Sequence, residues 1–491
     1  MKKPILLFTS SVMLFSAVLF SCSDEFTVRT PEYSIDSENY FNSEDEYNRA
    51  LIGAYDLLQS TYLNVMLGEI ASDNTNSGGE SATDVVGFQQ VDDMTHTPVN
   101  EDIYNIWRNM FAGVNRCNYI MEFKDKTDFA NKNQVLAETR FLRAYYYFEL
   151  VKWFGPVPLN GDKRFSATDI TILPRASEEE VYAAIEEDLL FAVENLDPVA
   201  AQTGRVTKGA AQALLGKIYL YQDKFTQSAA VLEELISSNQ YSLVEDYEAI
   251  FEHSGENGPE SVFEVQYTDA EGAGFGCLQC SEGNVAVGFN GVRNYTGPFF
   301  DAGFSFNVPR QEVVDAFEPG DVRKDVAILD IEEWAATTNA TYGIGYKHTG
   351  YYNRKYIPRQ GDANTGDQNL TNPNNYRAIR YADVLLMAAE AYNRGGISDE
   401  TAREYLNQVR QRAFGDNNHN INATGPALTD AIWTERRVEL VGEGHRFFDL
   451  VRTGRADEEI EGFVSGKHEV FPIPFQEIQF SNGNWQQNPN Y

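Results

Sequence analysis

The strongest helical pattern in the chain lies between residues 134 and 159, in the sequence QVLAETRFLRAYYYFELVKWFGPVPL. Its apolar positions recur at alternating four- and three-residue steps, and other apolar side chains fill a second face, which together predict a helix buried on nearly all sides. The first stripe comprises Ala137, Phe141, Ala144, Phe148 and Val151. Gly155 favours the end of a helix, and the prolines at 156 and 158 prevent its continuation. We therefore predict a central core helix that ends at Gly155.

The same periodicity predicts further helices on both sides of this core helix. One begins at Ser43, whose side chain can cap it with Glu46 as the other half of a capping box, and runs to about residue 59. A second amphipathic helix spans residues 100–123, and a third begins with the capping-box sequence at 177–180. Later helices are predicted over 309–317 and 430–442.

Two later segments share one spacing. Tyr219, in the sequence LGKIY, is followed by Ala229 and Leu232 at ten and thirteen residues, and Tyr392 is followed by alanine and tyrosine at the same distances. LGxxY is a fragment of the tetratricopeptide pattern. The spacing predicts two helical hairpins of one design, about 173 residues apart, that belong to a stack of helix pairs. The alternative is a chance pair of unrelated hairpins.

Between these hairpins the composition changes. Residues 262–267 alternate like a strand, and glycine, asparagine and aromatic residues dominate the segment that follows. A second stretch of small polar residues covers 71–84 and reads as a long loop, a type of segment that often carries function. We predict an irregular insertion of loops and short strands over about 241–375, which would present a ligand-binding face.

The first 21 residues have the features of a targeting segment. Two lysines are followed by an apolar run that is too short for a confident membrane span, and Ser21 precedes Cys22 as in a bacterial lipoprotein cleavage site. Cys22 would then carry lipid, and residues 22–40 would form a polar tether. The alternative is an ordinary secreted protein with a chance cysteine.

Charge and cysteine content narrow the choice of partner. The formal net charge of −34 repels phosphates, so we exclude nucleic acid as a partner.

Cys277 and Cys280 form a CxxC sequence without a second pair. This leaves a local disulfide or two free thiols as the favoured interpretations, and a zinc site as the less favoured one. Residues 362–369 space oxygen atoms like a cation-binding loop but depart from the EF-hand pattern. We predict a solvated turn there and no cofactor, with Ca²⁺ as the alternative.

Six segments carry a family resemblance, and they occur in the family's order along nearly the whole chain. They are RFLRAYYYFELVKWFGPVPL, GRVTKGAAQALLGKIYLY, RYADVLLMAAEAYNR, LNQVRQRA, ERRVELVGEGHRFFDLVR and PIPFQEIQFSNGNWQQNPNY. The sequence resembles the SusD/RagB-like outer-membrane lipoproteins of Bacteroidetes.

The resemblance implies a mostly α fold, in which a superhelix of tetratricopeptide-like helix pairs supports an irregular ligand-binding half of loops and short strands. Residues 41–491 would form this domain, with helical repeats over about 41–240 and 376–455. It further implies a protein lipid-anchored in the outer membrane at the cell surface, without enzyme activity. Such a protein binds an oligosaccharide, a polysaccharide or a related nutrient and delivers it to a SusC-like TonB-dependent transporter.

A glycan site requires flat apolar faces for sugar rings and polar groups for their hydroxyls. The loop after residue 70 and the insertion supply both, so we predict ligand contacts from nine residues. These are Asp73, Asn74, Asn76, Phe275, Arg293, Asn294, Tyr295, Trp334 and Tyr352.

Two other classes of protein remain as alternatives. A helical-repeat scaffold would bind peptides on a concave surface, but it would not need an aromatic, loop-rich insertion. A secreted glycoside hydrolase would need two placed carboxylates, and the chain contains neither an HExxH nor a GxSxG motif, nor a phosphate-binding loop.

Overall fold

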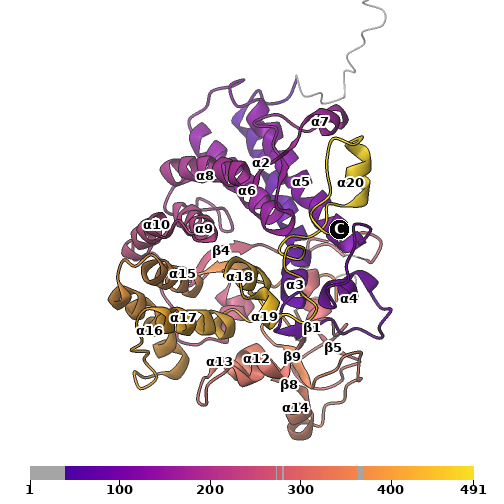
Figure 1. The fold of residues 1–491 in the computed structure, drawn as a ribbon, viewed down its shortest axis with the longest axis vertical. Helices are drawn as coiled ribbons and strands as arrows, with labels where there is room; N and C mark the ends of the chain where they lie inside the picture. The colour runs from indigo at the N-terminus through magenta and orange to yellow at the C-terminus, as the bar shows by residue number, and fades with distance from the viewer. Residues whose placement is uncertain (1–38, 273, 279–280, 363–368) are drawn as a thin grey trace, which may run out of the picture.

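The structure, a computed structural model, describes residues 39–272, 274–278, 281–362 and 369–491. The predicted signal peptide, Cys22, the tether up to residue 38, Cys280 and residues 363–368 of the predicted cation loop lie outside the described residues. Within these limits the fold is mostly α, with helix pairs stacked on one side and a less regular part with short strands on the other, as predicted (Figure 1). No described helix has both the length and the apolar character that a membrane crossing requires.

The core helix is α6 (Lys132–Phe154), and Gly155 follows it with a φ of +66°. From Val135 onward all but two of its side chains, those of Arg140 and Lys152, are buried. It packs between α5 (Glu101–Glu122) and α8 (Glu178–Asn195). The Tyr146 hydroxyl, which needs a partner in this position, donates to the carbonyl of Ala54 at 2.6 Å. The predicted central helix and its end are confirmed.

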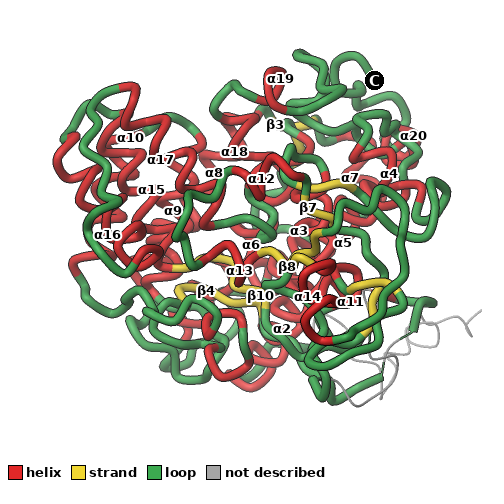
Figure 2. Tube along the Cα trace, turned by 90° about the horizontal axis from the view of Figure 1, so that it is seen from below, coloured by secondary structure: helices red, strands yellow, loops and turns green. Residues whose placement is uncertain are grey.

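The two predicted hairpins are direct neighbours. The first consists of α9 (Lys208–Tyr221) and α10 (Phe225–Ser237), the second of α15 (Tyr381–Arg394) and α16 (Asp399–Phe414). Because α10 packs against α15, the stack continues across the insertion as if the chain were uninterrupted. Figure 2 shows these four helices gathered at one side of the molecule, with long loops and short strands beyond them.

The helix starts follow the local sequence. The Ser177 side chain accepts from the Glu180 amide and the Glu180 carboxylate accepts from the Ser177 amide, so the predicted capping box is present. Ser43 caps α2 (Glu44–Asp56) as predicted, but Glu46 accepts from the amide of Asn42, one residue earlier than the motif requires.

The other helical segments are short or lie at the edges of the stack. They are η2 (Leu57–Thr61), α3 (Tyr62–Ile70), α4 (Val86–Asp92), α7 (Ala167–Ile172), η3 (Ala249–Phe251), η4 (His253–Gly255), α11 (Val285–Asn290), α12 (Gln311–Asp315), α13 (Arg323–Ala327), α14 (Ile331–Thr338), α17 (Pro426–Glu439), α18 (Arg446–Arg452), α19 (Ala456–Glu459) and α20 (Phe475–Phe480).

The described strands form five two-stranded sheets, and four of these are antiparallel. The pairs are β1 (Thr75–Asn76) with β7 (Val308–Pro309), β4 (Ser261–Val265) with β10 (Tyr376–Arg380), β2 (Val157–Pro158) with β3 (Arg175–Ala176), the parallel β5 (Val292–Arg293) with β6 (Ala302–Gly303), and β8 (Ile328–Asp330) with β9 (Tyr351–Asn353). The β4–β10 pair joins the start of the insertion to the residues that lead directly into α15.

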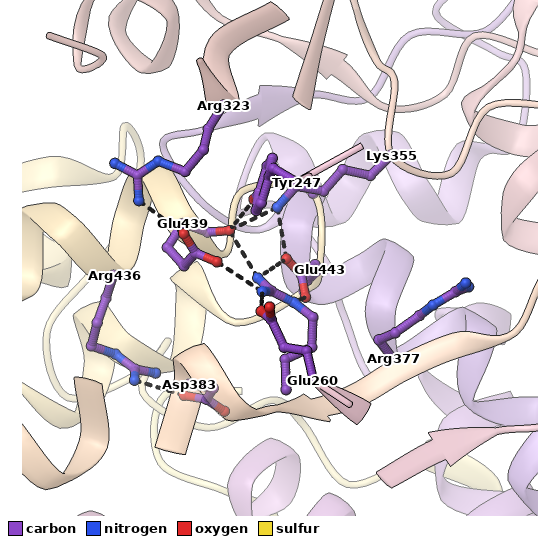
Figure 3. Close-up of polar contacts among 12 residues, drawn as sticks. Tyr247, Glu260, Arg323, Lys355, Arg377, Asp383, Arg436, Glu439 and Glu443 are labelled. Carbon is purple, nitrogen blue, oxygen red and sulfur yellow. Dashed lines mark hydrogen bonds and ion pairs between the residues drawn. The ribbon is translucent and has the colours of Figure 1, made fainter. Parts of the chain in front are cut away.

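A buried cluster of charged side chains joins the insertion to the helical half (Figure 3). Arg380, at the end of β10, is fully buried and contacts three glutamates. Its guanidinium donates to Glu260 at 2.7 Å, to Glu439 at 2.7 Å and to Glu443 at 2.8 and 2.9 Å. Glu260 comes from the insertion, whereas Glu439 and Glu443 lie at the end of α17 and just after it.

Two more cations from the insertion reach the same glutamates. Arg323 donates to Glu439 at 2.8 Å, and Lys355 donates to Glu443 at 2.6 Å. All four of these side chains are at most 1 % exposed. Burial alone would raise the pKa of Glu439, but Arg412, Arg380 and Arg323 more than offset this and hold the pKa well below its usual range. The insertion is therefore fixed to the repeats by a network of buried ionised groups, to which Arg412 and Glu435 also contribute ion pairs.

We expect Arg380→Met to destabilise the protein strongly, by about 3–5 kcal/mol, because it leaves three buried carboxylates with an incomplete set of cations. The measurement is the free energy of unfolding from urea titration, followed by circular dichroism. Arg49→Met is the matched control, because the exposed pair of Arg49 with Asp45 at 2.8 Å should contribute at most about 0.5 kcal/mol. Equal losses in the two variants would show that the cluster is not what holds the insertion.

Candidate functional site

A cavity of about 500 Å³ lies where the first helices meet the insertion. Its walls come from α3, the segment before and within α4, α5, and two parts of the insertion, at 275–278 and 289–306. The cavity thus brings together the two regions that the sequence predicts to contribute ligand contacts.

One wall of the cavity is aromatic. Phe88, Phe289 and Phe306 are buried and contact one another, with ring centroids 5.3–5.7 Å apart. Phe304 continues this surface from Phe289 at 5.8 Å, and Phe275 meets Phe304 edge-on at 5.6 Å. Phe275 is 61 % exposed, so the aromatic wall runs from a buried floor to an open rim.

The same cavity is also lined by a polar stripe on α5. Asp102, Asn105 and Asn109 follow one another at three- and four-residue steps, which places them on one face of the helix. No hydrogen bond or ion pair from the described residues reaches any of these three side chains. The two amides can donate and accept hydrogen bonds, and the carboxylate can accept them. A ligand in the cavity would therefore find both unused hydrogen-bonding groups and aromatic rings.

The sequence of α5 explains why this stripe faces the cavity. Asn100 caps the helix by accepting from the amides of Asp102 and Ile103, so the helix starts with a fixed orientation. Ile103, Ile106 and Met110 are buried. The polar stripe adjoins this apolar face and borders the cavity, with Asn109 buried in its lining.

Asp102 is a carboxyl group of the cavity whose pKa is clearly shifted. Burial in the cavity wall, together with the negative charge of the neighbouring Glu101, raises its pKa to about 6. The carboxylate also contributes to the raised pKa of Tyr62, whose ring lines the cavity from α3. A carboxylate that is kept in this position without a counter-charge is a feature more typical of binding sites than of structural cores.

Arg293 supplies the cavity's cation. Its guanidinium donates to the Phe304 carbonyl at 2.8 Å and to the Ser305 hydroxyl at 3.3 Å, and it lies 3.4 Å from the Asp84 carboxylate. Asp84 in turn accepts from the amide of Glu80 at 2.8 Å. These contacts tie the loop after β1 to β5 of the insertion, so they hold two walls of the cavity together.

Of the nine residues predicted as ligand contacts, the structure places Phe275 and Arg293 on this cavity. Asn76 lies in β1, opposite Val308, and Asn294 is exposed with a φ of +50°. Neither lines the cavity.

Asp73 and Asn74 are buried, because arginines from the C-terminal part of the chain use their oxygen atoms. Arg446 donates to Asp73 at 2.7 and 2.9 Å, and Arg437 donates to Asn74 at 2.9 Å. Their place in the structure is therefore that of ion-pair and hydrogen-bond partners within the protein, not of cavity groups.

Tyr295, Trp334 and Tyr352 belong to a small separate core of the insertion. The Trp334 indole donates to the Tyr295 hydroxyl at 2.9 Å, and that hydroxyl donates to the Pro298 carbonyl at 2.7 Å. Tyr352 is fully buried. Loss of any of these rings would act first on the folding of the insertion.

The sequence analysis did not single out Asp102, Asn105 or Asn109. A signal was present, since these three polar residues share one helical stripe in the segment predicted as amphipathic. The solvated face of any surface helix shows the same pattern. Only the cavity that these three residues share with the phenylalanine rings distinguishes them from ordinary surface positions.

The described residues give little support to the metal-binding alternatives. No group of three or more His, Cys, Asp or Glu side chains within them is arranged to hold a metal ion. Cys277, on the cavity rim, is part of a disulfide, which bears out the disulfide reading of the CxxC sequence for this residue. Cys117 is a free, buried thiol.

Comparison with known families matches both ends of the chain. Residues 329–491 match the family described as "SusD family", and residues 29–220 match the one described as "Starch-binding associating with outer membrane". A relative from Formosa agariphila, named SusD-like protein P38, is 28 % identical over 520 residues that cover 98 % of each chain.

Solved structures agree with this match along the whole fold. The chain is 35 % identical to one titled "Laminarin binding SusD-like protein", with a TM-score of 0.84 over 92 % of this chain and 100 % of the other. It is 27 % identical to surface glycan-binding protein A from Bacteroides thetaiotaomicron in complex with laminarihexaose, with a TM-score of 0.80 over 91 % and 100 % of the two chains. With the stacked helix pairs and the inserted irregular half described above, these matches show that the chain belongs to the SusD/RagB-like family.

Proposed function

We propose that this protein binds a carbohydrate in the cavity between α5 and the insertion and passes it to a partner transporter. The observation that carries the proposal is the stripe of Asp102, Asn105 and Asn109, whose side chains have no partner among the described residues and line the same cavity as a cluster of phenylalanine rings.

The two walls match the two kinds of surface that a sugar presents. The faces of a pyranose ring are apolar and pack on aromatic rings, whereas the ring edges carry hydroxyls that both donate and accept hydrogen bonds. The exposed ring of Phe275 offers such a packing surface at the rim, and the two asparagine amides offer both donors and acceptors. The laminarin and laminarihexaose in the titles of two similar structures support the same class of ligand.

Binding without catalysis is the activity we propose. A glycoside hydrolase needs an acid and a second carboxylate on opposite sides of the scissile bond. Of the three carboxylates in this cavity, Asp84 is engaged by Arg293 and by a backbone amide, whereas Glu80 and Asp102 have no ion-pair partner among the described residues. The glycan-binding titles of the similar structures favour binding over hydrolysis. A peptide-binding scaffold would use the helix stack alone, whereas the unused polar groups of α5 line a cavity that the insertion helps to form.

Delivery to a transporter is the second part of the proposal. The lipoprotein-like start of the sequence supports attachment of Cys22 to lipid and a place at the outer-membrane surface. The family description that refers to association with the outer membrane supports the same location. A SusC-like TonB-dependent transporter is the partner that the resemblance implies.

We expect Phe275→Ala to weaken carbohydrate binding about 3- to 10-fold, because it removes the exposed ring at the rim of the cavity. Asn105→Ala should weaken binding to a similar degree by removing hydrogen bonds to ligand hydroxyls. Isothermal titration calorimetry with laminarihexaose, preceded by affinity electrophoresis against a panel of neutral and acidic polysaccharides, measures the effect.

Matched controls exist for both changes. Phe480, on α20, is 60 % exposed, and Asn133 is an exposed asparagine on α6. Neither lines the cavity. Phe480→Ala and Asn133→Ala should leave binding unchanged. If these control variants weaken binding as much as the cavity variants do, the ligand site lies elsewhere. Separately, release of new reducing ends when the protein is incubated with polysaccharides would favour the hydrolase.

We expect Asp102→Asn to stabilise the folded protein at pH 7.5, by about 1–3 kcal/mol. Because the pKa of Asp102 is raised to about 6, the folded state binds this proton more tightly than the unfolded chain does. Stability from this group is therefore greatest below pH 4, falls as pH rises toward 6, and stays reduced above that. Urea unfolding at pH 7.5 and pH 4 should show a gain at the higher pH that disappears at the lower.

The charged and titratable groups that lie beside Asp102 stay the same in this comparison. Glu101 on α5 and Tyr62 on α3 interact with Asp102, and Glu80, Asp84 and Arg293 are the other charged side chains that line the cavity. Asp45→Asn is the control, since Asp45 is also the second residue of its helix but is exposed and paired with Arg49. It should cost a few tenths of a kcal/mol. A stabilised Asp45→Asn, or an unchanged Asp102→Asn, would contradict the assignment.

The transporter is tested by affinity purification from detergent-solubilised outer membrane. We expect the lipidated protein to recover a large β-barrel protein, and Cys22→Ala to reduce this recovery by releasing the protein from the membrane. Recovery of periplasmic proteins alone would contradict delivery to a transporter, while leaving carbohydrate binding as a separate question.

A further inference from the structure

We propose that the cavity accepts uncharged glycans and excludes those that carry carboxylate or sulfate groups. The inference deepens the proposed carbohydrate binding and rests on it. It is carried by the balance of charges on the cavity wall, which is independent of the aromatic and amide groups that provide affinity for sugars in general.

Three carboxylates line the cavity, from Glu80, Asp84 and Asp102. Arg293 is the one cationic side chain among the described lining residues. Its charge is balanced by Asp84, 3.4 Å away. Glu80 and Asp102 thus remain without a counter-charge, and a ligand anion in the cavity would face a surplus of negative charge.

Arg293 is also poorly placed to receive an anion. Its side chain is 16 % exposed, and its Nε and Nη2 donate to Ser305 and Phe304 of the insertion. Recognition of carboxylate or sulfate typically uses a guanidinium that presents two parallel donors to the ligand. Here Nη2, which belongs to both edges of the guanidinium that present paired donors, is engaged by Phe304 and Asp84, and Nε is engaged by Ser305.

The charge of the whole chain acts in the same direction. The formal net charge of −34 produces a negative potential around the protein, and a cleft with low-dielectric walls concentrates that potential. Neutral hydroxyls are insensitive to it. They can also donate hydrogen bonds to the two unpaired carboxylates, which turns the feature that repels an anion into one that binds a sugar.

The experiment compares glycans that differ only in charge. Laminarihexaose and cellohexaose are each measured by calorimetry beside their C6-oxidised forms, in which the primary hydroxyls have become carboxylates. At pH 7.5 and low salt, we expect each oxidised form to bind at least about tenfold more weakly than its neutral parent. Raising the salt concentration to 0.5 M should strengthen binding of the oxidised form and leave the neutral one unchanged, because salt screens repulsion.

Two isosteric variants move the discrimination in opposite directions. Asp102→Asn removes one negative charge from the cavity and should lower the ratio of the dissociation constant of the oxidised glycan to that of its neutral parent. Asn105→Asp adds one negative charge and should raise this ratio. Both variants are compared with the wild type by circular dichroism before titration, and the salt dependence of the wild type does not depend on either variant.

The outcomes separate this inference from the proposal on which it rests. An oxidised form that binds as tightly as its parent, or a ratio that is indifferent to salt and to both variants, overturns the exclusion of anions while carbohydrate binding stands. Binding of acidic polysaccharides without binding of neutral ones would likewise overturn the exclusion of anions. Failure of every neutral and acidic glycan to bind overturns the proposed function itself, and this inference with it.

Discussion

The fold depends on buried pairing between arginines and glutamates across the boundary of the insertion. Glu439 and Glu443, at and just after the end of α17, receive Arg380 from the repeat side and Arg323 and Lys355 from the insertion. Because the cluster is buried, a misplaced insertion would leave several charges uncompensated away from solvent. Such a cluster adds little to stability compared with a well-packed apolar core, but it penalises every alternative docking of the insertion. We therefore regard the correct positioning of the insertion on the repeats, and not added stability, as the main contribution of the cluster.

A second set of contacts transmits this positioning to the cavity. Glu69, at the end of α3, accepts from the amides of Gly442 and Gly444, which flank Glu443 of the buried cluster. Three residues after Glu69, the chain enters the segment that contains Asp73 and leads into β1 and the cavity loop. Because β1 pairs with β7 of the insertion, the cavity loop is held from both sides. The walls of the site are thus positioned by contacts that lie outside it.

The sequence predicted the helices well because their determinants are local. The core helix and the capping box at Ser177 depend on residues within one or two turns of each other, and the spacing within each hairpin spans only thirteen residues. The β4–β10 pair was only half predicted, since β10 precedes α15 without a turn signal and pairs with a segment more than 100 residues away. Strand pairing of that kind is set by tertiary packing, which a local pattern does not encode.

The candidate site shows the same limit more sharply. Asp73 has the chemistry of a ligand group and lies in a loop, yet Arg446, 373 residues later, uses both of its oxygens. Asp102 looks like an ordinary solvated position near the start of a helix, yet it faces a cavity without a partner. Residue type tells which side chains can bind a sugar, whereas their availability depends on long-range pairing. In a chain with this many acidic residues, the carboxylates that the arginines leave unpaired are the candidates for ligand binding. The fold identifies Asp102, in the cavity that we assign to the ligand, as one of them.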